Sequence, residues 1–338
     1  MVGMPTVLIC DDSPTMRIAL RRTLVLGGLA VLGEAATGEE AVALAKQLKP
    51  DLITMDVMLP DLDGFLATRA ILANGPARIV IVSAAGEALQ SDLSFRALQS
   101  GALDLVEKPE AGGSDALQAW GKALARNLQA LAALPVGTRP EAGPRPARPH
   151  VGERRAAGFA IAVSTGGPPA LARLLKGLPP TLSYPVLVAQ HIAAGFTNGL
   201  ASWLATQTPL KVRVAEGGEL AEPGTVWLAK DRTDMVLHEG GRLRIQANPG
   251  GVCPNGDRLL RSVAERLGKS GAGAVLTGMG ADGAQGLLAM RRAGALTFVQ
   301  EGGSCAVDGM PAAAMAMGAA EGRLTLDELG FVMAQLGR

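Results

Sequence analysis

The sequence predicts an α/β protein made of two consecutive domains, each built on a mainly parallel β-sheet. The chain has 338 residues, a natural length for two domains that each bury a core. Short apolar runs alternate with helix-like stretches along most of it, which is typical of parallel strands joined by helical crossovers. A proline-rich stretch near the middle interrupts this alternation and separates the two parts.

The first domain is expected over residues 4–125. Its strand candidates are five short apolar runs: Thr6–Cys10, Ala30–Ala35, Leu52–Met55, Ile79–Ser83 and Leu103–Glu107. Helical periodicity fills the gaps between them, with clear helical stretches at Arg17–Leu26 and Glu39–Leu48. We therefore expect a parallel sheet with helical crossovers.

Residues 126–157 are expected to hold the end of a helix, near Leu134, followed by a linker. Prolines recur among Gly, Arg and Ala from Pro135 to about Ala157. This composition cannot build a core and is typical of a spacer between domains.

The second domain, expected over residues 158–338, resumes the alternation and is predicted to be doubly wound and mainly parallel. Its strand candidates are Phe159–Val163, Val186–Gln190, Val212–Ala215, Val226–Ala229, Ala274–Thr277 and Ala295–Gln300. A helix is expected over Pro168–Lys176. The segment Met235–Ile245 carries Gly240-Gly241 between two apolar runs, which predicts an antiparallel hairpin.

Composition excludes several classes of protein. The net charge is +1, and aromatic residues make up 3% of the chain, which argues against a nucleic-acid partner. No apolar run approaches the length of a membrane span, and no secretory signal is visible. The three cysteines are widely separated and form neither a disulfide framework nor a zinc cluster. We expect a soluble, cytoplasmic protein with no direct membrane insertion.

Polar side chains stand at the ends of four strands in the first domain. Asp11 and Asp12 follow the first strand, Asp56 follows the third, Ser83 ends the fourth and Lys108 follows the fifth. The carboxyl ends of parallel strands meet at one edge of the sheet, so we expect these groups to cluster there. Packed carboxylates favour a divalent cation such as Mg²⁺, and a metal-screened carboxylate can attack a phosphoryl donor. Ser83 and Lys108 suit the new phosphate oxygens, although any one of these aspartates alone would more simply cap a helix.

The same residues resemble the receiver domain of bacterial response regulators. The matching motifs are Asp11-Asp12-Ser13, Asp56 with Leu59-Pro60-Asp61-Leu62-Asp63-Gly64, Ser83-Ala84 and Lys108-Pro109. The resemblance implies a flavodoxin-like fold, Asp56 as the phosphorylation site and a histidine kinase as phosphodonor. It also implies that Asp11, Asp12, Asp56 and the Met58 carbonyl bind Mg²⁺. Leu105 stands where many receivers carry an aromatic switch residue, so the usual aromatic relay is not expected.

A serine in the second domain stands where a nucleophile could be activated. Ser164 directly follows the strand Phe159–Val163, and Thr165-Gly166-Gly167-Pro168 turns from it into a helix. Backbone N–H groups and the helix dipole there favour developing negative charge. The arrangement is analogous to a nucleophile elbow. A helix-capping serine, or a turn that only holds an anion, fits the same local pattern.

Counting histidines narrows the choice of base. Of the three in the chain, His150 lies in the linker and His238 lies beside the hairpin turn, whereas His191 follows the strand Val186–Gln190. If Ser164 has an imidazole base, it is therefore His191. Asp282 lies in the turn after the strand Ala274–Thr277 and is expected at the same sheet edge, where it could orient the imidazole or cap a helix.

These segments resemble the catalytic domain of the chemotaxis protein-glutamate methylesterases, the CheB family. The matching pieces are residues 164–168, 190–192, 277–283 and 304–311, and a receiver placed ahead of this domain is the family's architecture. The resemblance implies Ser164 as nucleophile, His191 as base, Asp282 as orienting carboxylate, and Thr165 and Met279 beside an oxyanion site. The implied reaction is hydrolysis of glutamate γ-methyl esters on the cytoplasmic domains of methyl-accepting chemoreceptors. Many members also deamidate receptor glutamines, and neither reaction needs a cofactor.

The resemblance also implies regulation, and two departures from the family concern the rim of the cleft. The unphosphorylated receiver is expected to cover the active site and to uncover it when phosphorylated. Asp234 takes the place of a histidine that relatives usually carry, within a segment where they have a Pro-Gly turn. Asn255-Gly256 replaces the serine of a more usual Pro-Ser pair ahead of an aspartate. Both departures are expected to affect substrate choice more than chemistry.

Other functions fit parts of the sequence. Gly278-x-Gly280-x-x-Gly283 follows a strand, opens a helix and has Glu301 after the next strand, which is the layout of a dinucleotide fingerprint. That interpretation leaves Ser164 and His191 without a role. A non-catalytic scaffold controlled by the receiver would keep the phosphorylation cluster and lose the chemistry, and a stand-alone amidase would share the catalytic residues.

Overall fold

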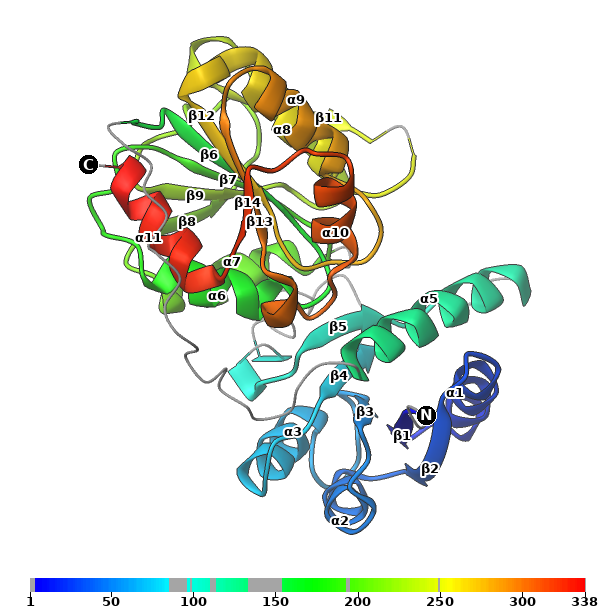
Figure 1. Ribbon diagram of the computed structural model, residues 1–338. Helices are drawn as coiled ribbons and strands as arrows, with labels where there is room; N and C mark the ends of the chain where they lie inside the picture. The colour runs from blue at the N-terminus through cyan, green and yellow to red at the C-terminus, as the bar shows by residue number, and fades with distance from the viewer. Residues whose placement is uncertain are drawn as a thin grey trace. The chain divides into compact units, whose positions relative to one another are not determined.

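A computed structural model describes residues 4–84, 96, 97, 99–109, 114–132, 154–192, 195–248 and 250–337. The chain divides into two compact units, residues 1–139 and 140–338 (Figure 1). Most of the expected linker over residues 126–157, and the helix end expected near Leu134, lie outside the described residues.

The first unit is a five-stranded, fully parallel sheet with the strand order β2-β1-β3-β4-β5. The strands are β1 (Thr6–Cys10), β2 (Ala30–Ala35), β3 (Leu52–Met55), β4 (Ile79–Ser83) and β5 (Asp104–Glu107). The helices are α1 (Pro14–Leu26), α2 (Gly38–Leu48), α3 (Gly64–Ala73) and α5 (Ser114–Ala132). Helix α1 packs against α5 on one face of the sheet, and α2 packs against α3 on the other.

Caps explain where the first helices begin. Helix α1 starts at Pro14, earlier than the expected Arg17, because the Ser13 side chain accepts a hydrogen bond from the Met16 N–H and proline suits the first helical position. Helix α2 starts after Thr37, whose side chain accepts from the Glu40 N–H. The Ser13 cap lies in the turn that follows β1, and the Ser13 N–H also donates to Asp11 Oδ1 at 3.0 Å.

The second unit is built on a seven-stranded parallel sheet with the order β14-β13-β12-β6-β7-β9-β8. Its strands are β6 (Gly158–Val163), β7 (Val186–Gln190), β8 (Lys211–Val214), β9 (Thr225–Leu228), β12 (Gly271–Val275), β13 (Leu296–Gln300) and β14 (Gly322–Leu324). A separate antiparallel hairpin joins β10 (Thr233–Leu237) to β11 (Leu243–Ala247). The predicted fold class is thus confirmed in both units, hairpin included.

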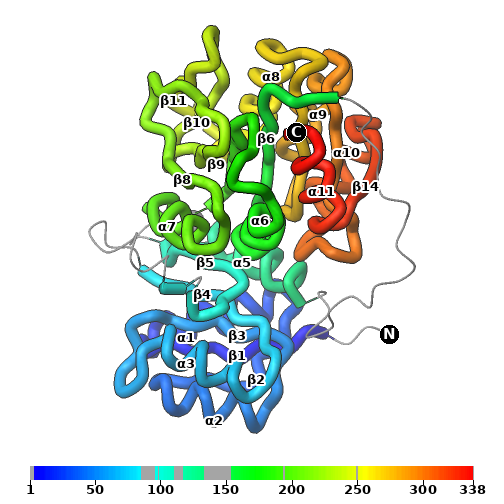
Figure 2. Tube along the Cα trace, turned by 90° about the vertical axis from the view of Figure 1, so that its left-hand side faces the viewer, coloured from blue at the N-terminus to red at the C-terminus, as the bar shows by residue number. Residues whose placement is uncertain are grey.

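Helices cover both faces of this larger sheet. They are α6 (Gly167–Lys176), α7 (Thr197–Gln207), α8 (Gly256–Leu267), α9 (Ala284–Arg292), α10 (Gly309–Ala316) and α11 (Leu326–Leu336). Helices α6, α7 and α11 lie on one face, and α8, α9 and α10 lie on the other (Figure 1, Figure 2). The core on the α8–α9 side contains Leu259, Leu260 and Met290, and the hairpin packs onto it through α8.

One strand differs from its prediction by several residues. The run Ala274–Thr277 was expected, but β12 spans Gly271–Val275, because glycine and alanine allow close packing that apolar periodicity does not signal. A Cβ atom at Gly273 would lie 2.7 Å from Met290 Sδ, so the helix α9 packs directly on the strand backbone. Within the described residues, no helix is long and apolar enough to cross a membrane.

Candidate active site

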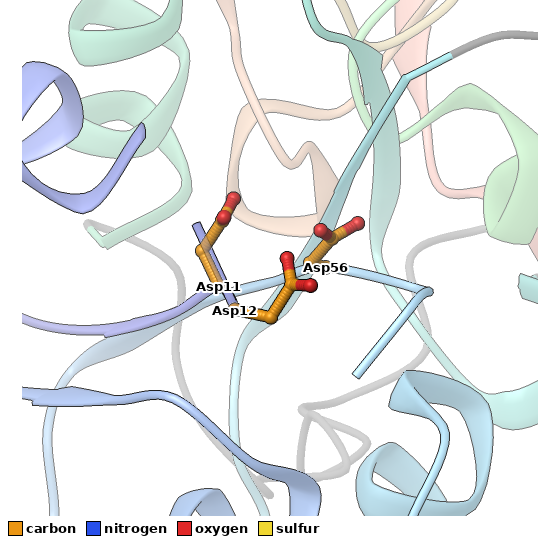
Figure 3. A group of neighbouring side chains, drawn as sticks. All are labelled: Asp11, Asp12 and Asp56. Carbon is orange, nitrogen blue, oxygen red and sulfur yellow. The ribbon is translucent and has the colours of Figure 1, made fainter. Parts of the chain in front are cut away.

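Three carboxylates meet at the carboxyl edge of the first sheet. Asp11 and Asp12 follow β1 and Asp56 follows β3, and one oxygen of each lies within 4.8 Å of the others (Figure 3). Asp11 and Asp56 are buried, whereas Asp12 is exposed. The expected clustering of these three aspartates is therefore present.

Lys108 neutralises part of this cluster. Its Nζ donates to Asp56 Oδ2 at 2.6 Å and lies 2.8 Å from Asp11 Oδ2. Burial alone would lower the pKa of Lys108, but the two carboxylates outweigh it and raise that pKa. Burial raises the pKa of Asp11, and Lys108 opposes this shift. The buried Asp11 Oδ2 faces this ammonium group. The fit to Mg²⁺ rests on the three carboxylates, each of which offers one oxygen to a common point.

The remaining predicted receiver residues lie near the cluster. The Met58 N–H reaches Asp56 Oδ1 at 3.5 Å, a long contact that places this backbone beside the carboxylate. Ser83 is buried at the end of β4. Leu105, which stands where many receivers carry an aromatic switch residue, is buried in β5. Gly64 allows the loop to close, because a Cβ there would lie 1.9 Å from the Asp56 carbonyl oxygen.

In the second unit, neighbouring strands bring Ser164 and His191 to one sheet edge. Strands β6 and β7 are parallel and their last register pair is Val163 with Gln190, so Ser164 and His191 are the next residues on each strand. The His191 N–H continues the ladder to the Val163 carbonyl at 2.9 Å. Adjacent strands are about 4.8 Å apart, which sets the two residues side by side. Both are described and half-buried, and their side chains do not hydrogen bond to each other.

Asp282 completes the predicted group. It lies in the turn between β12 and α9, and its Oδ2 is 2.7 Å from His191 Nε2. The His191 side chain is 14% exposed and that of Asp282 is 8% exposed, so the contact is shielded from water. Such shielding strengthens a hydrogen bond to an ionised partner.

The N-terminus of α8 also holds Asp282. The Gly256 N–H donates to Asp282 Oδ2 at 2.6 Å, and the Asp257 N–H donates to Oδ1 at 3.1 Å. Burial alone would raise the pKa of Asp282, but hydrogen bonds from His191, Gly256 and Asp257 outweigh it and keep that pKa below its ordinary value. Asp282 is therefore ionised at neutral pH.

The residues expected near an oxyanion site flank Ser164. Thr165 follows it in the turn, and its carbonyl accepts a 2.9 Å hydrogen bond from Thr277 Oγ1. A Cβ at Gly278 would lie 2.6 Å from Ser164 Cβ, so the backbone that leads into Met279 packs directly against the serine. Thr165 is thus next to Ser164 in the chain, and Met279 directly follows the glycine that packs against it.

Two further residues support the site and were not predicted to do so. Gln190 is buried, and its Nε2 donates to the Ser164 carbonyl at 3.0 Å and to the His191 carbonyl at 2.7 Å. Gly256 was expected only to reshape the cleft rim, yet its N–H binds Asp282. Gln190 could have been found from the sequence, because it is a polar residue at the end of an otherwise apolar strand. Gly256 could not, because it acts through its backbone N–H.

Comparison with known proteins identifies both units. The family model of the CheB methylesterase matches residues 159–333, and that of the response regulator receiver domain matches residues 7–118. Protein-glutamate methylesterase/protein-glutamine glutaminase 3 of Myxococcus xanthus (strain DK1622) is 47% identical over 311 residues, which cover 91% of this chain and 87% of that protein. The identically named protein of Anaeromyxobacter dehalogenans (strain 2CP-C) is 44% identical over 331 residues and is covered to 96%, as is this chain.

A solved structure agrees with the second unit. The crystal structure of the Thermotoga maritima CheB methylesterase catalytic domain has a TM-score of 0.51 and 30% identity, and the match covers 54% of this chain and 98% of that one. The predicted family is confirmed: this chain belongs to the CheB methylesterases and carries a response regulator receiver domain ahead of its catalytic domain.

Proposed function

We propose that this enzyme hydrolyses glutamate γ-methyl esters on the cytoplasmic domains of methyl-accepting chemoreceptors and deamidates receptor glutamines by the same route. The observation that carries the proposal is the 2.7 Å contact of His191 with Asp282, at the sheet edge that also presents Ser164. The names of the similar proteins of Myxococcus and Anaeromyxobacter support protein glutamate methyl esters and glutamines as the groups acted on.

The protonation of His191 follows from its partner. An ionised Asp282 can only accept hydrogen bonds, so the Nε2 atom that faces it carries a proton. The neutral imidazole then has its lone pair on Nδ1, which makes Nδ1 the atom that takes a proton from Ser164 Oγ. Asp282 fixes this tautomer and stabilises the imidazolium that forms.

The reaction balances as two acyl transfers. Ser164 Oγ bonds to the γ-carbonyl carbon as its proton passes to His191, and the ester C–O bond breaks when His191 returns that proton to the leaving methanol. A water molecule then attacks the γ-glutamyl-serine ester and restores Ser164, releasing glutamate. With a glutamine substrate, ammonia leaves in place of methanol. Backbone N–H groups near Thr165 and Met279 would stabilise the oxyanion, at about 3 kcal/mol for each donor.

The receiver residues support control by phosphorylation. Asp56 would accept a phosphoryl group from a histidine kinase, and Lys108 would bind its oxygens. Asp11, Asp12, Asp56 and the Met58 carbonyl would hold Mg²⁺, which supplies charge neutralisation at this edge. In the proposed regulation, the unphosphorylated receiver restricts access to Ser164 and the phosphorylated one relieves this, in the cytoplasm where receptors present their signalling domains. We assign residues 4–125 to the receiver, 126–157 to the joining segment and 158–338 to the catalytic domain.

Methanol release from a methylated chemoreceptor fragment tests the proposal. The full-length protein, treated with a small-molecule phosphodonor and Mg²⁺, should release methanol faster than untreated protein. Ser164→Ala should abolish release, while Ser202→Ala, an exposed serine on α7, should leave it unchanged. Absence of release from phosphorylated wild-type protein would favour a scaffold, and binding of a nicotinamide dinucleotide would favour the fingerprint interpretation of the Gly278–Gly283 turn.

A further inference from the structure

We propose that Asp234, together with Arg258, is a positioning residue that holds Asp282 and thereby His191 in place. The inference rests on the proposed Ser164–His191–Asp282 mechanism. Asp234 lies in β10, outside the parallel sheet, and its side chain is fully buried at 0% exposure. A buried carboxylate of this kind is tolerated only where its charge and lone pairs are matched.

Both oxygens of Asp234 are used. Oδ1 accepts from the Asn255 N–H at 2.8 Å and from Asn248 Nδ2 at 3.0 Å. Oδ2 accepts from Arg258 Nη1 at 2.5 Å, and Arg258 Nη2 also donates to Gln246 at 3.2 Å. The carboxylate therefore joins the hairpin to the segment that enters α8.

The residues at the start of α8 also hydrogen bond to Asp282. Asn255 is the N-cap of α8, and its Oδ1 accepts from the Arg258 N–H at 2.8 Å. The next two residues, Gly256 and Asp257, donate their N–H groups to Asp282. One peptide unit thus separates the N–H that Asp234 binds from the N–H that Asp282 binds at 2.6 Å.

Asp234 acts on the reaction through this geometry and does not touch the reacting atoms. If the first residues of α8 shift, Asp282 loses the Gly256 and Asp257 N–H donors, and its 2.7 Å contact with His191 lengthens. Because an amide keeps one acceptor oxygen but carries no charge, Asp234→Asn would lose the charge-assisted pair with Arg258 and place an N–H₂ group among donors. The expected consequence is a slower chemical step with little change in substrate binding.

The test compares Asp234→Asn with a structural control, Tyr184→Phe, in full-length phosphorylated protein. Tyr184 is buried and donates to the Met333 carbonyl at 2.6 Å, remote from Asp282 in the fold, so its loss should lower stability alone. For Asp234→Asn we expect kcat for methanol release to fall about tenfold to a hundredfold with KM within twofold, since a misplacement of about 1 Å costs on that order. Assays run at a temperature where both variants are folded.

A double-mutant cycle and an NMR readout separate positioning from stability. In an Asp282→Asn background, Asp234→Asn should lower kcat no further, because Asp234 acts through Asp282. The downfield resonance of the His191 Nε2–H, which needs no substrate, should weaken in Asp234→Asn and persist in Tyr184→Phe. Arg258→Lys keeps the positive charge and loses the planar guanidinium, and it serves as the test if Asp234→Asn does not fold. It should also lower kcat and weaken the His191 resonance.

The outcomes are distinguishable. Additive effects of the two substitutions, or an unchanged His191 resonance and kcat in Asp234→Asn and Arg258→Lys, would overturn the positioning role. Failure of wild-type protein to release methanol would instead contradict the proposed function, and the resonance would still report whether Asp234 orders the His191–Asp282 pair.

Discussion

Adding one methyl group at Gly256 should slow catalysis although it removes no polar group. A Cβ there would lie 2.6 Å from Ala162 Cβ and 3.0 Å from Asp282 Oδ2. Carbon atoms in contact are about 3.5–4.0 Å apart, so the Gly256 backbone would have to move by about 1 Å. Ala162 belongs to the buried strand β6 and has no room to yield.

This displacement acts on the Asp282 hydrogen bond. The Gly256 N–H to Asp282 Oδ2 distance is 2.6 Å, and an increase of about 1 Å would end the bond. Asp282 would lose a donor or follow it away from His191. We expect Gly256→Ala to lower kcat about tenfold to a hundredfold and to destabilise the fold by about 1–3 kcal/mol through overpacking.

The assay measures methanol release and thermal unfolding for Gly256→Ala beside Gly322→Ala. Gly322 starts β14, adopts no left-handed conformation and has open space where its Cβ would be, so alanine should be tolerated. If Gly256→Ala keeps the kcat and unfolding midpoint of Gly322→Ala, the close approach does not position Asp282 and the reasoning fails.

Three further predictions test other parts of the molecule. Asp56→Asn, or removal of Mg²⁺ by a chelator, should abolish phosphoryl incorporation from a small phosphodonor measured by mass spectrometry, whereas Asp51→Asn, at the opposite edge of the sheet beside Thr6, should keep it. Folding lowers the pKa of Asp282, so its ionised carboxylate contributes to the free energy of unfolding at pH values above its pKa in the unfolded chain, about 3.9. This contribution is lost as the pH falls through the lower pKa of the folded protein. Denaturant titrations should therefore show a flatter dependence of unfolding free energy on acidic pH for Asp282→Asn, and curves that stay parallel would contradict the shift. Arg173→Ala, which breaks the exposed ion pair between α6 and α11, should cost less than about 1 kcal/mol by the same titration and leave kcat unchanged; a larger loss would mean that this surface pair is better ordered than its exposure suggests.

Sequence patterns predicted the parallel strands that end in functional residues with little error. Strands β1, β3, β4 and β7 have the bounds expected from their apolar runs, because strands buried on both faces read as continuous hydrophobic segments. The short edge strand β14 and the helices α8, α10 and α11 had no specific prediction. Their positions depend on packing against the sheet, which local periodicity describes poorly.

The candidate site was predictable where side chains act at strand ends. Ser164, His191 and Asp282 could be chosen because parallel strands deliver their carboxyl ends to one edge. The support of Asp282 by the Gly256 and Asp257 N–H groups could not be predicted in the same way, since a backbone donor leaves no trace in residue type. Only the helix start itself, capped by Asn255, carried a local signal.

Asp234 shows why a buried charge is hard to predict from a strand pattern alone. It stands among apolar residues in Thr233–Leu237, so an alternating strand would place either Asp234 or its apolar neighbour toward the core. In the structure both Asp234 and Met235 are buried, which an alternating pattern does not predict. Helix α8 packs against β10, and Asn248, Asn255 and Arg258 hydrogen bond to Asp234. A carboxylate covered in this way requires donors, and Arg258, two residues beyond the glycine that holds Asp282, supplies one of them. We therefore propose that Asp234, whose substitution for a histidine was expected to affect the cleft rim, also anchors the start of α8, whose first N–H groups bind Asp282.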